Sequence, residues 1–294
     1  MDESERTGEV VAIIGAGEMG AAVGRRLRES GARVLTSLRG RGPQSVERVR
    51  RAGLEVVDDD DELVRRADFV LSIVPPGVAV EVAHRLRDPL ARAPRRPVFA
   101  ECNAISPAAV TQIAQILSGS RCRFVDAGII GGPPPSDLRA AGPRFYASGP
   151  DAPALARLGS HGLDIALIEG PIGAASGLKL SYAGLTKGLT ALGAAMIAGA
   201  ARAGLADALR TELLRSQPDL IARLRRHLPP MVPKAYRWVA EMEEIAQFLG
   251  GKDRGAGIYL GAARLYERIA REFTADDSGE TLAALFSFCN LTET

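Results

Sequence analysis

The segment from Val10 to Gly20, VVAIIGAGEMG, constrains the fold of this chain more than any other stretch. Five apolar residues lead directly into glycines at positions 15, 17 and 20, and the residues that follow are patterned like a helix. The spacing G-x-G-x-x-G between a strand and a helix is typical of a parallel β–α–β unit that binds a dinucleotide. Gly15 allows the tight turn, Gly17 lets the backbone approach a pyrophosphate, and Gly20 lets the helix pack closely on the strand.

A helix that begins at this turn presents N–H groups and a partial positive charge to phosphates. We therefore expect the whole turn to contact a dinucleotide, namely Gly15, Ala16, Gly17, Glu18, Met19 and Gly20. The alternative is a glycine-rich turn without a ligand. The strand–helix pattern farther along the chain favours the dinucleotide site.

Strand and helix patterns alternate through the first half of the chain. Short apolar runs predict strands at residues 10–14, 33–37, 68–74, 97–102, 123–129 and 144–149. Amphipathic segments between them predict helices at residues 18–29, 44–51, 78–87 and 107–117. Such an alternation, with apolar strands, predicts a parallel sheet that helices cover on both faces.

Only helical patterns follow residue 172. They predict helices at residues 174–203, 205–215, 218–227, 232–249 and 256–272, with Pro229-Pro230 as a break and Gly250-Gly251 as a helix end. The sequence therefore predicts an α/β domain over residues 1–172, followed by an all-helical domain over residues 173–294.

Composition and charge exclude several classes of partner. The chain has 294 residues, with 37 basic and 35 acidic side chains, so its charge favours neither nucleic acid nor an anionic membrane. Arginine-rich runs such as GRRLRES (residues 24–30) have helical spacing and are expected to be solvated faces. The apolar stretch 189–201 is short and weakly apolar for a membrane span. The N-terminal residues lack the apolar core of a signal peptide, and the three cysteines lack metal-ligand spacing. We expect a soluble cytoplasmic protein without a metal site.

The end of the second predicted strand indicates which dinucleotide is bound. An NAD site usually offers an acidic residue there, whose carboxylate accepts from the ribose 2′-hydroxyl. This chain instead has Thr36, Ser37, Arg39 and Arg41, and no acid before Glu47. Hydroxyl and guanidinium groups bind a 2′-phosphate through charge-assisted hydrogen bonds. The sequence therefore predicts NADP.

A second loop at the same edge of the predicted sheet is SIVPPGVAV, which contains Val74, Pro75 and Pro76. A rigid apolar loop after a strand can support a ribose or nicotinamide in the crevice outside the sheet. A simple turn that ends the strand is the equally simple alternative.

Five motifs in order make the chain similar to the β-hydroxyacid dehydrogenase family, the relatives of 6-phosphogluconate dehydrogenase. They are GAGEMG, VPPGVAVEVA, ECNAISPAAV, DAGIIGG and GAASGLKLSYAG. The resemblance covers most of the chain and is closest to a little-characterised subgroup. It implies a Rossmann domain, a long interdomain helix and a helical domain that commonly forms homodimers. It also implies NAD(P)-dependent oxidation or reduction of small 3-hydroxy acids.

The resemblance also implies roles for individual positions. Lys179 falls on the family's catalytic lysine, and Asn103 falls in the segment near the nicotinamide. Gly131 and Gly132 match two residues of the turn that holds the substrate carboxylate. The chain departs from the family at Ile130, where a serine is usual, and at Ala183, where an asparagine is usual. These departures concern the substrate more than the type of reaction.

The choice of lysine at position 179 has a chemical reason. The chain contains four lysines against many arginines. Hydride transfer at a carbinol carbon requires a group that exchanges a proton with its oxygen, and arginine does not deprotonate usefully. Tyr182 and Thr186 follow at helical spacing and are expected to line the substrate cleft beside Lys179. For Lys187, a cation that faces solvent or phosphate and a residue that anchors substrate are both compatible with the sequence.

The sequence thus predicts an NADP-dependent enzyme that acts on a small anionic substrate. Two alternatives stay open at this point. An imine reductase shares the fold, although such enzymes generally replace the lysine. A non-catalytic NADPH-binding protein would be consistent with Ile130 and Ala183.

Overall fold

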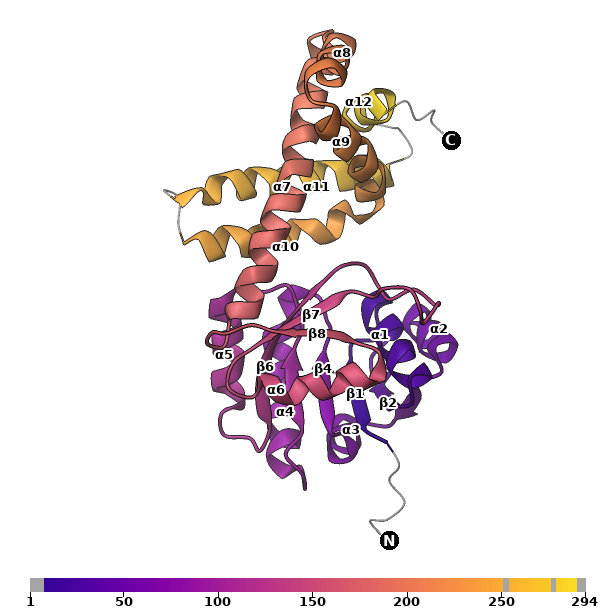
Figure 1. Ribbon diagram of the computed structural model, residues 1–294, viewed down its shortest axis with the longest axis vertical. Coiled ribbons are helices and arrows are strands. Elements are labelled where there is room, and N and C mark those ends of the chain that lie inside the picture. The colour runs from indigo at the N-terminus through magenta and orange to yellow at the C-terminus, as the bar shows by residue number, and fades with distance from the viewer. Residues whose placement is uncertain (1–7, 251–253, 276–278, 290–294) are drawn as a thin grey trace. The chain divides into compact units, whose positions relative to one another are not determined.

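The structure is a computed structural model that describes residues 8–250, 254–275 and 279–289. The chain divides into two compact units, Met1–Lys179 and Leu180–Thr294. The division falls inside the long helix α7 (Ala174–Arg202), a little beyond the boundary expected from the sequence (Figure 1).

The described part of the first unit contains one eight-stranded sheet, in the order β3-β2-β1-β4-β5-β6-β7-β8. The pairs are parallel except for β6 with β7, which are antiparallel. The order reverses between β1 and β4, where open α/β sheets bind ligands beyond the carboxyl ends of the strands. The strands are β1 (Val10–Ile14), β2 (Arg33–Ser37), β3 (Glu55–Val57), β4 (Phe69–Ser72), β5 (Val98–Glu101), β6 (Arg123–Ile130), β7 (Arg144–Ser148) and β8 (Asp164–Leu167).

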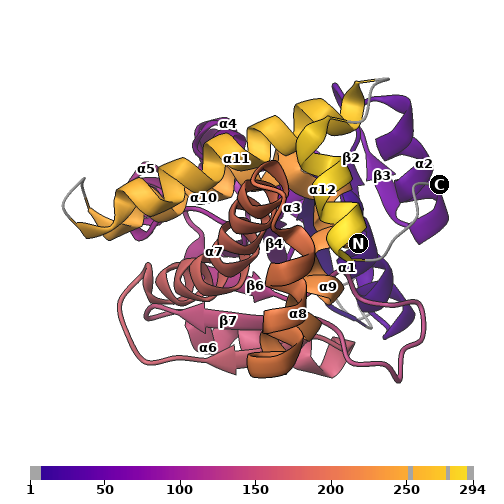
Figure 2. The ribbon, with the colours of Figure 1, turned by 90° about the horizontal axis from the view of Figure 1, so that it is seen from above.

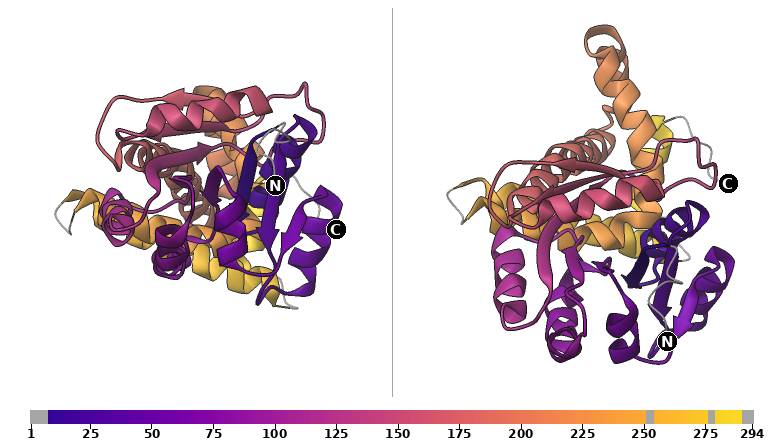
Figure 3. Two further views of the ribbon diagram at one scale, coloured as in Figure 1. Left: turned by 90° about the horizontal axis from the view of Figure 1, so that it is seen from below. Right: turned by 60° about the horizontal axis from the view of Figure 1, so that its bottom comes forward.

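Helices cover both faces of this sheet (Figure 3). Alternate residues of β1 enter opposite cores: Val11 and Ile13 pack with α1, α2 and α6, whereas Ala12 and Ile14 pack with α3, α4 and α5. This is why β1 is apolar throughout. The α-helices are α1 (Glu18–Glu29), α2 (Pro43–Ala52), α3 (Asp60–Arg66), α4 (Ala79–Arg92), α5 (Pro107–Leu117) and α6 (Ala152–Leu155), with 3₁₀ turns at Pro76–Val78 and Ala156–His161.

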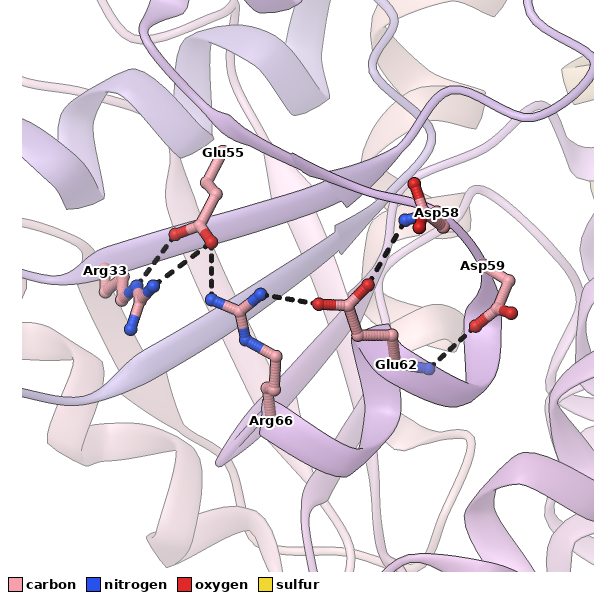
Figure 4. A network of polar contacts seen from close by, with 6 residues as sticks. All are labelled: Arg33, Glu55, Asp58, Asp59, Glu62 and Arg66. Carbon is pink, nitrogen blue, oxygen red and sulfur yellow. Dashed lines mark hydrogen bonds and ion pairs between the residues drawn. The ribbon is translucent and has the colours of Figure 1, made fainter. Parts of the chain in front are cut away.

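The predicted fold class and the six predicted strands are confirmed. Two further strands, β3 and β8, were not predicted because they lie at the two edges of the sheet, are only partly buried and lack the fully buried apolar run that marks the inner strands. Ion pairs hold β3 in place (Figure 4): Glu55 accepts hydrogen bonds from Arg33 of β2 and from Arg66 of α3. The bonds from Arg33, more than those from Arg66, hold the pKa of the Glu55 carboxyl below its usual value.

The expectation that residues 24–30 form a solvated face is wrong at Arg26. Its side chain is buried, and its guanidinium donates to the carbonyl oxygens of Pro135, Asp137, Leu138 and Ala140 at 3.0–3.4 Å. The segment between β6 and β7 is rich in proline, so these carbonyls have few backbone N–H groups to pair with. Arg26 satisfies them and fixes the segment against α1.

The described part of the second unit is helical. Besides the later part of α7, it comprises α8 (Ala206–Ser216), α9 (Pro218–Met231), α10 (Ala235–Leu249), α11 (Ala256–Thr274) and α12 (Glu280–Cys289). Helices α10 and α11 lie side by side (Figure 2). Gly250 ends α10 in the left-handed conformation, as predicted, and Gly251 lies outside the described residues. The predicted break at Pro229-Pro230 is wrong: both prolines lie in the last turn of α9, and a 3₁₀ turn, Val232–Lys234, follows them.

Helix α7 is apolar on two opposite faces. Leu180, Ala183, Ala191, Ala194 and Ile197 enter the core of the second unit. The opposite face carries large apolar side chains that are exposed, here called the apolar stripe: Tyr182, Leu185, Leu189, Leu192 and Met196. Together the two faces make the helix long and apolar enough to cross a membrane, although 39% of its most apolar stretch is buried inside the protein. Core helices of soluble proteins meet the same criterion, so this finding alone assigns no membrane.

Candidate cofactor and active site

The glycine turn after β1 has the geometry that its spacing predicts. Gly15 has a φ of +94°, and a Cβ atom there would lie 2.4 Å from the carbonyl oxygen of Ile73. A Cβ atom at Gly20 would lie 2.1 Å from the Gly15 oxygen. At Gly17 a Cβ atom would meet nothing within 4 Å. Gly15 and Gly20 are therefore required by the fold, whereas the open side of Gly17 leaves room for a ligand to approach the backbone.

The start of α1 is suited to an anion. Gly17 is its N-cap and has no side chain to accept from the first N–H groups of the helix. Glu18 is exposed at this end, while Ala16 is buried and Met19 packs against the core. The turn is thus held by its apolar side chains and presents backbone N–H groups, as a pyrophosphate requires.

A cleft of about 500 Å³ extends from this turn to the loop after β2. Arg39 and Arg41 line it, both side chains are exposed, and neither makes an ion pair with the described residues. Two of the acidic residues of the cleft pair with two of its other arginines: Asp60 with Arg85 at 2.8 Å and Asp61 with Arg92 at 2.6 Å. The lining consists of Ile13, Ile14, Gly15, Ser37, Arg39, Gly40, Arg41, Asp59, Asp60, Asp61, Arg85, Asp88, Pro89 and Arg92.

The two hydroxyls at the end of β2 differ in accessibility. Ser37 lines the cleft, and its Oγ accepts from the backbone N–H of Arg39 at 3.4 Å. Thr36 is buried and donates to the Ile13 carbonyl oxygen at 2.8 Å. The expectation that the Thr36 hydroxyl helps to bind a phosphate is therefore wrong. Successive side chains of a strand point to opposite faces of the sheet, and that of Thr36 lies on a buried face.

The loop after β4 is tied to the loop after β5 by an asparagine. The Oδ1 atom of Asn103 accepts from the backbone N–H of Val74 at 2.6 Å, and its Nδ2 donates to the Ser72 hydroxyl at 3.1 Å. Val74 in turn packs beside Gly15, and Pro75 and Pro76 lead into a 3₁₀ turn. Asn103 therefore positions the loop beside the dinucleotide turn, and its direct contact with a nicotinamide stays a prediction.

A row of buried polar side chains crosses the middle of the sheet. In register, Ser72 of β4 lies beside Glu101 of β5, Glu101 beside Asp126 of β6, and Asp126 beside Ser148 of β7. All four are fully buried. Residues paired across strands point to the same face, so the four side chains form one continuous polar row on one face of the sheet.

The N-terminus of α7 packs on this row. The Asp126 carboxylate accepts from the backbone N–H groups of Gly173, Ala175 and Ser176 at 2.9–3.1 Å. It also accepts from the hydroxyls of Ser176 and Ser148, at 2.6 and 2.8 Å. A carboxylate at this end satisfies otherwise unpaired N–H groups and complements the helix dipole. Asp126 thus fixes where α7 begins.

Lys179 lies one turn into α7, and glycine brings it close to the sheet. A Cβ atom on Gly128 of β6 would lie 2.8 Å from the Ala175 oxygen and 3.1 Å from the Lys179 Cβ. The Lys179 Nζ donates to the carbonyl oxygen of Cys102, directly after β5, at 3.2 Å. The half-buried ammonium is therefore held at the carboxyl end of β5, on the same side of the sheet as the glycine turn after β1.

Glu101 is a polar residue of this site that sequence reasoning missed. It is fully buried, its Oε1 accepts from the Asn103 N–H at 3.0 Å, and its Oε2 is buried and has no hydrogen-bond partner in the part of the chain that the structure describes. Burial raises the pKa of this carboxyl to about 8. The signal in the sequence was an acidic residue at the end of an otherwise apolar strand, PVFAEC.

The predicted substrate residues are less closely assembled. Gly131 has a φ of +128° and follows β6, whereas Gly132 is exposed with open space around its Cα. Tyr182 is 52% exposed, and the Thr186 hydroxyl donates to the Tyr182 carbonyl oxygen at 2.9 Å. Tyr182 and Thr186 belong to the second unit, so their place beside Lys179 stays a prediction.

Lys187 belongs to neither of the roles that the sequence left open. Its ammonium pairs with Glu241 of α10 and lies 4.8 Å from the centre of the Trp238 ring. Its carbonyl oxygen accepts from the Tyr266 hydroxyl at 2.6 Å. Lys187 therefore joins α7, α10 and α11 inside the second unit, through an ion pair and a cation–π contact.

Comparison with known families decides which family this is. Residues 10–156, half of the chain, match the NAD binding domain of 6-phosphogluconate dehydrogenase. The chain belongs to this family. Residues 200–269 match a domain of unknown function that recurs in other proteins. Lys179 lies between the two matched ranges, so its role rests on its motif and its geometry.

Two relatives match most of this chain. An uncharacterised 28.5 kDa protein of Methanothermus fervidus is 26% identical over 68% of this chain and 74% of its own length. A conserved protein of unknown function, described as structurally similar to 3-hydroxyacid dehydrogenases, is 29% identical, with a TM-score of 0.67 over 90% of this chain and 99% of that one.

Two enzymes of known activity share the fold. The 3-hydroxyisobutyrate dehydrogenase of Mycobacterium tuberculosis, solved with L-serine, is 21% identical, with a TM-score of 0.67 over 96% of this chain and 99% of its own. A reductive aminase of Aspergillus terreus, solved with NADPH, is 16% identical, with a TM-score of 0.56 over the same shares of both chains. The fold of this family member is thus that of the 3-hydroxyacid dehydrogenases, and its first unit is an NAD(P)-binding domain.

Proposed function

We propose that this protein is an NADP-dependent oxidoreductase that transfers a hydride to or from a small hydroxy or oxo acid, with Lys179 as general acid and base. The observation that carries the proposal is the place of Lys179. Its ammonium is held at the carboxyl end of β5, in a family whose dinucleotide binds at this edge of the sheet.

The residues around the cleft fit an NADP molecule. The turn at Gly15–Gly20 offers its backbone to the pyrophosphate, and Arg39 and Arg41 offer two cations to a 2′-phosphate. A guanidinium that has no acidic partner in the described structure can form charge-assisted hydrogen bonds with phosphate without first breaking an ion pair. When bound, the cofactor accepts or supplies the hydride.

Lys179 supplies the proton chemistry. In oxidation the amine accepts the proton of the substrate hydroxyl while the hydride leaves the same carbinol carbon. In reduction the ammonium returns a proton to the carbonyl oxygen. Arginine at this position would keep its proton and would serve neither direction. The N–H groups of Gly131 and Gly132 are proposed to receive the anionic end of the substrate.

Replacing either arginine of the cleft tests the cofactor assignment. Arg39→Ala and Arg41→Ala should each weaken NADPH binding about tenfold, because each loses a charge-assisted bond worth about 1.4 kcal/mol. The binding of NADH should be unchanged, since it lacks the 2′-phosphate. Fluorescence titration of both cofactors measures this, with Arg48→Ala as the control: Arg48 is an exposed arginine of α2 outside the cleft. Unchanged NADPH affinity in both variants would remove the NADP assignment.

Replacing the lysine tests the chemical role. Lys179→Ala and Lys179→Arg should each lower kcat by about 10²- to 10⁴-fold with a panel of 3-hydroxy acids and NADP⁺, because neither side chain accepts the proton. NADPH should still bind with nearly its original affinity. Lys234→Ala removes an exposed lysine of the second unit and should change neither quantity. A loss of less than tenfold in kcat for Lys179→Ala would show that Lys179 is not the general acid and base.

The same assays separate the two alternatives. Turnover of imines, but of no hydroxy or oxo acid, would identify an imine reductase. Tight NADPH binding with no turnover of acids, alcohols or imines would identify a non-catalytic NADPH-binding protein. The presence of Lys179 favours the hydroxyacid reaction over both.

We further propose that two copies of the chain associate through the apolar stripe of α7. Its residues, from Tyr182 to Met196, recur alternately three and four residues apart, which is the spacing of a helix that packs along another helix. Such a seam is complementary to itself, so a second copy of this chain is the partner that matches it in length and in chemistry. Contiguous exposed apolar surface of this kind marks an interaction site.

The stripe predicts the mass of the protein in solution. Light scattering after gel filtration should give about twice the 31.0 kDa of one chain for the wild type. It should give one chain for Leu185→Glu combined with Leu192→Glu, since two charges would enter the seam. Leu214→Glu, on an exposed face of α8, is the matched control and should remain dimeric. A monomeric wild type, or a wild type that sediments with lipid vesicles, would contradict the dimer.

A further inference from the structure

We infer that Glu101 is a positioning residue that acts through Lys179: the two side chains form one coupled pair, and the charge of the Glu101 carboxyl decides how firmly the Lys179 amine holds its proton. This inference rests on the proposed role of Lys179 in proton transfer. In this inference Glu101 of β5 sets the pH at which Lys179 of α7 loses its proton.

The position of Glu101 supports this role. It is the last residue of β5, and the next residue, Cys102, accepts the hydrogen bond from the Lys179 Nζ. The Glu101 side chain is fully buried, with one oxygen bonded to the Asn103 N–H and the other without a hydrogen-bond partner among the described residues. A buried carboxylate oxygen without a partner is costly, so a nearby cation or a bound proton must stabilise it.

The charges around Glu101 leave Lys179 as its partner. From β6, Asp126 faces the same row, but its carboxylate is saturated by donors from α7 and β7. From β4, Ser72 is neutral, although its hydroxyl also favours the ionised Glu101 carboxyl. Directly after β5, burial raises the pKa of the Cys102 thiol, so the thiol is neutral as well. Among the described residues, the positive charge that acts on Glu101 is that of Lys179, which, together with the larger effects of the Asn103 N–H and the Ser72 hydroxyl, favours the ionised carboxyl against the effect of burial.

The order of proton loss follows from these surroundings. Burial dominates at Glu101 and places the loss of its proton at about pH 8. Below that pH the pair is an acid beside an ammonium, and above it the new carboxylate holds the remaining proton on Lys179. Two groups that interact by more than about one pKa unit titrate in steps that belong to the pair. Glu101 would thus keep Lys179 in its proton-donating form at alkaline pH.

The titration of the Lys179 side chain tests the pair without any substrate. The chain has four lysines, so ¹³C-labelled lysine gives four Cε signals, and Lys179→Arg identifies the relevant one. In the wild type this signal should shift in two steps, the first near pH 8, because Glu101 ionises beside it. In Glu101→Gln it should shift in a single step whose midpoint lies at least about one pH unit below the upper step of the wild type. Glu101→Asp, which restores the charge, should restore two steps.

A control variant and two different negative results separate this inference from the proposed function. Glu47→Gln removes a carboxylate of α2 that pairs with Arg50 and Arg51, and it should leave the Lys179 curve unchanged. A single step with the same midpoint in the wild type and in Glu101→Gln would overturn the inferred pair. If the variant does not fold, a single step in the wild type is enough to overturn it. A two-step curve in a protein that turns over no acid would instead contradict the proposed function.

The pH dependence of catalysis gives a second readout. With a substrate acid in the oxidative direction, Glu101→Gln should reach its full kcat/KM at a pH about one unit lower than the wild type, since Lys179 loses its proton more readily. A residue with a merely structural role would lower kcat/KM at every pH and would leave the shape of the profile unchanged. That second result would overturn the inference.

Discussion

The arrangement of this protein depends on one buried carboxylate. Asp126 accepts five hydrogen bonds, three from backbone N–H groups at the start of α7 and two from serine hydroxyls. Because these bonds satisfy the N–H groups of a buried helix end, they fix where α7 begins on the sheet. The glycine at position 128 then lets the first turns of the helix approach β6, which sets the Lys179 side chain at the end of β5.

Helix α7 belongs to both units. Its first turns belong to the dinucleotide-binding unit, and its remaining turns enter the core of the helical unit. Small side chains such as Ala191 and Ala194 face that core, whereas Leu185, Leu189 and Leu192 face outward. An apolar helix of this length needs a partner on both faces, and the proposed second copy of the chain supplies the one that the described structure lacks.

The parts of the fold and site that sequence predicted are those that depend on local spacing. The turn at Gly15–Gly20, the six predicted strands and the long helix follow from patterns within a few residues of one another. The residues that were missed or misread depend on tertiary contacts. Arg26 is buried because a proline-rich segment distant in sequence needs donors, and Lys187 is engaged because α10 brings Glu241 beside it. The role of Glu101 depends on the residues that lie beside it on β4 and β6, and the sequence of β5 alone does not reveal these neighbours.

Hydrogen exchange at the start of α7 tests the central claim, that Asp126 holds the helix that carries Lys179. In Asp126→Asn the amide NH₂ would face the N–H donors of the helix, and the loss of a buried charged partner costs about 3 kcal/mol. The account predicts that the amides of Ala175 and Ser176 lose at least about 100-fold protection, since 1.4 kcal/mol is a factor of ten. Amides of β1 and β2 should keep theirs. Unchanged protection at Ala175 and Ser176 in the folded variant would contradict the account.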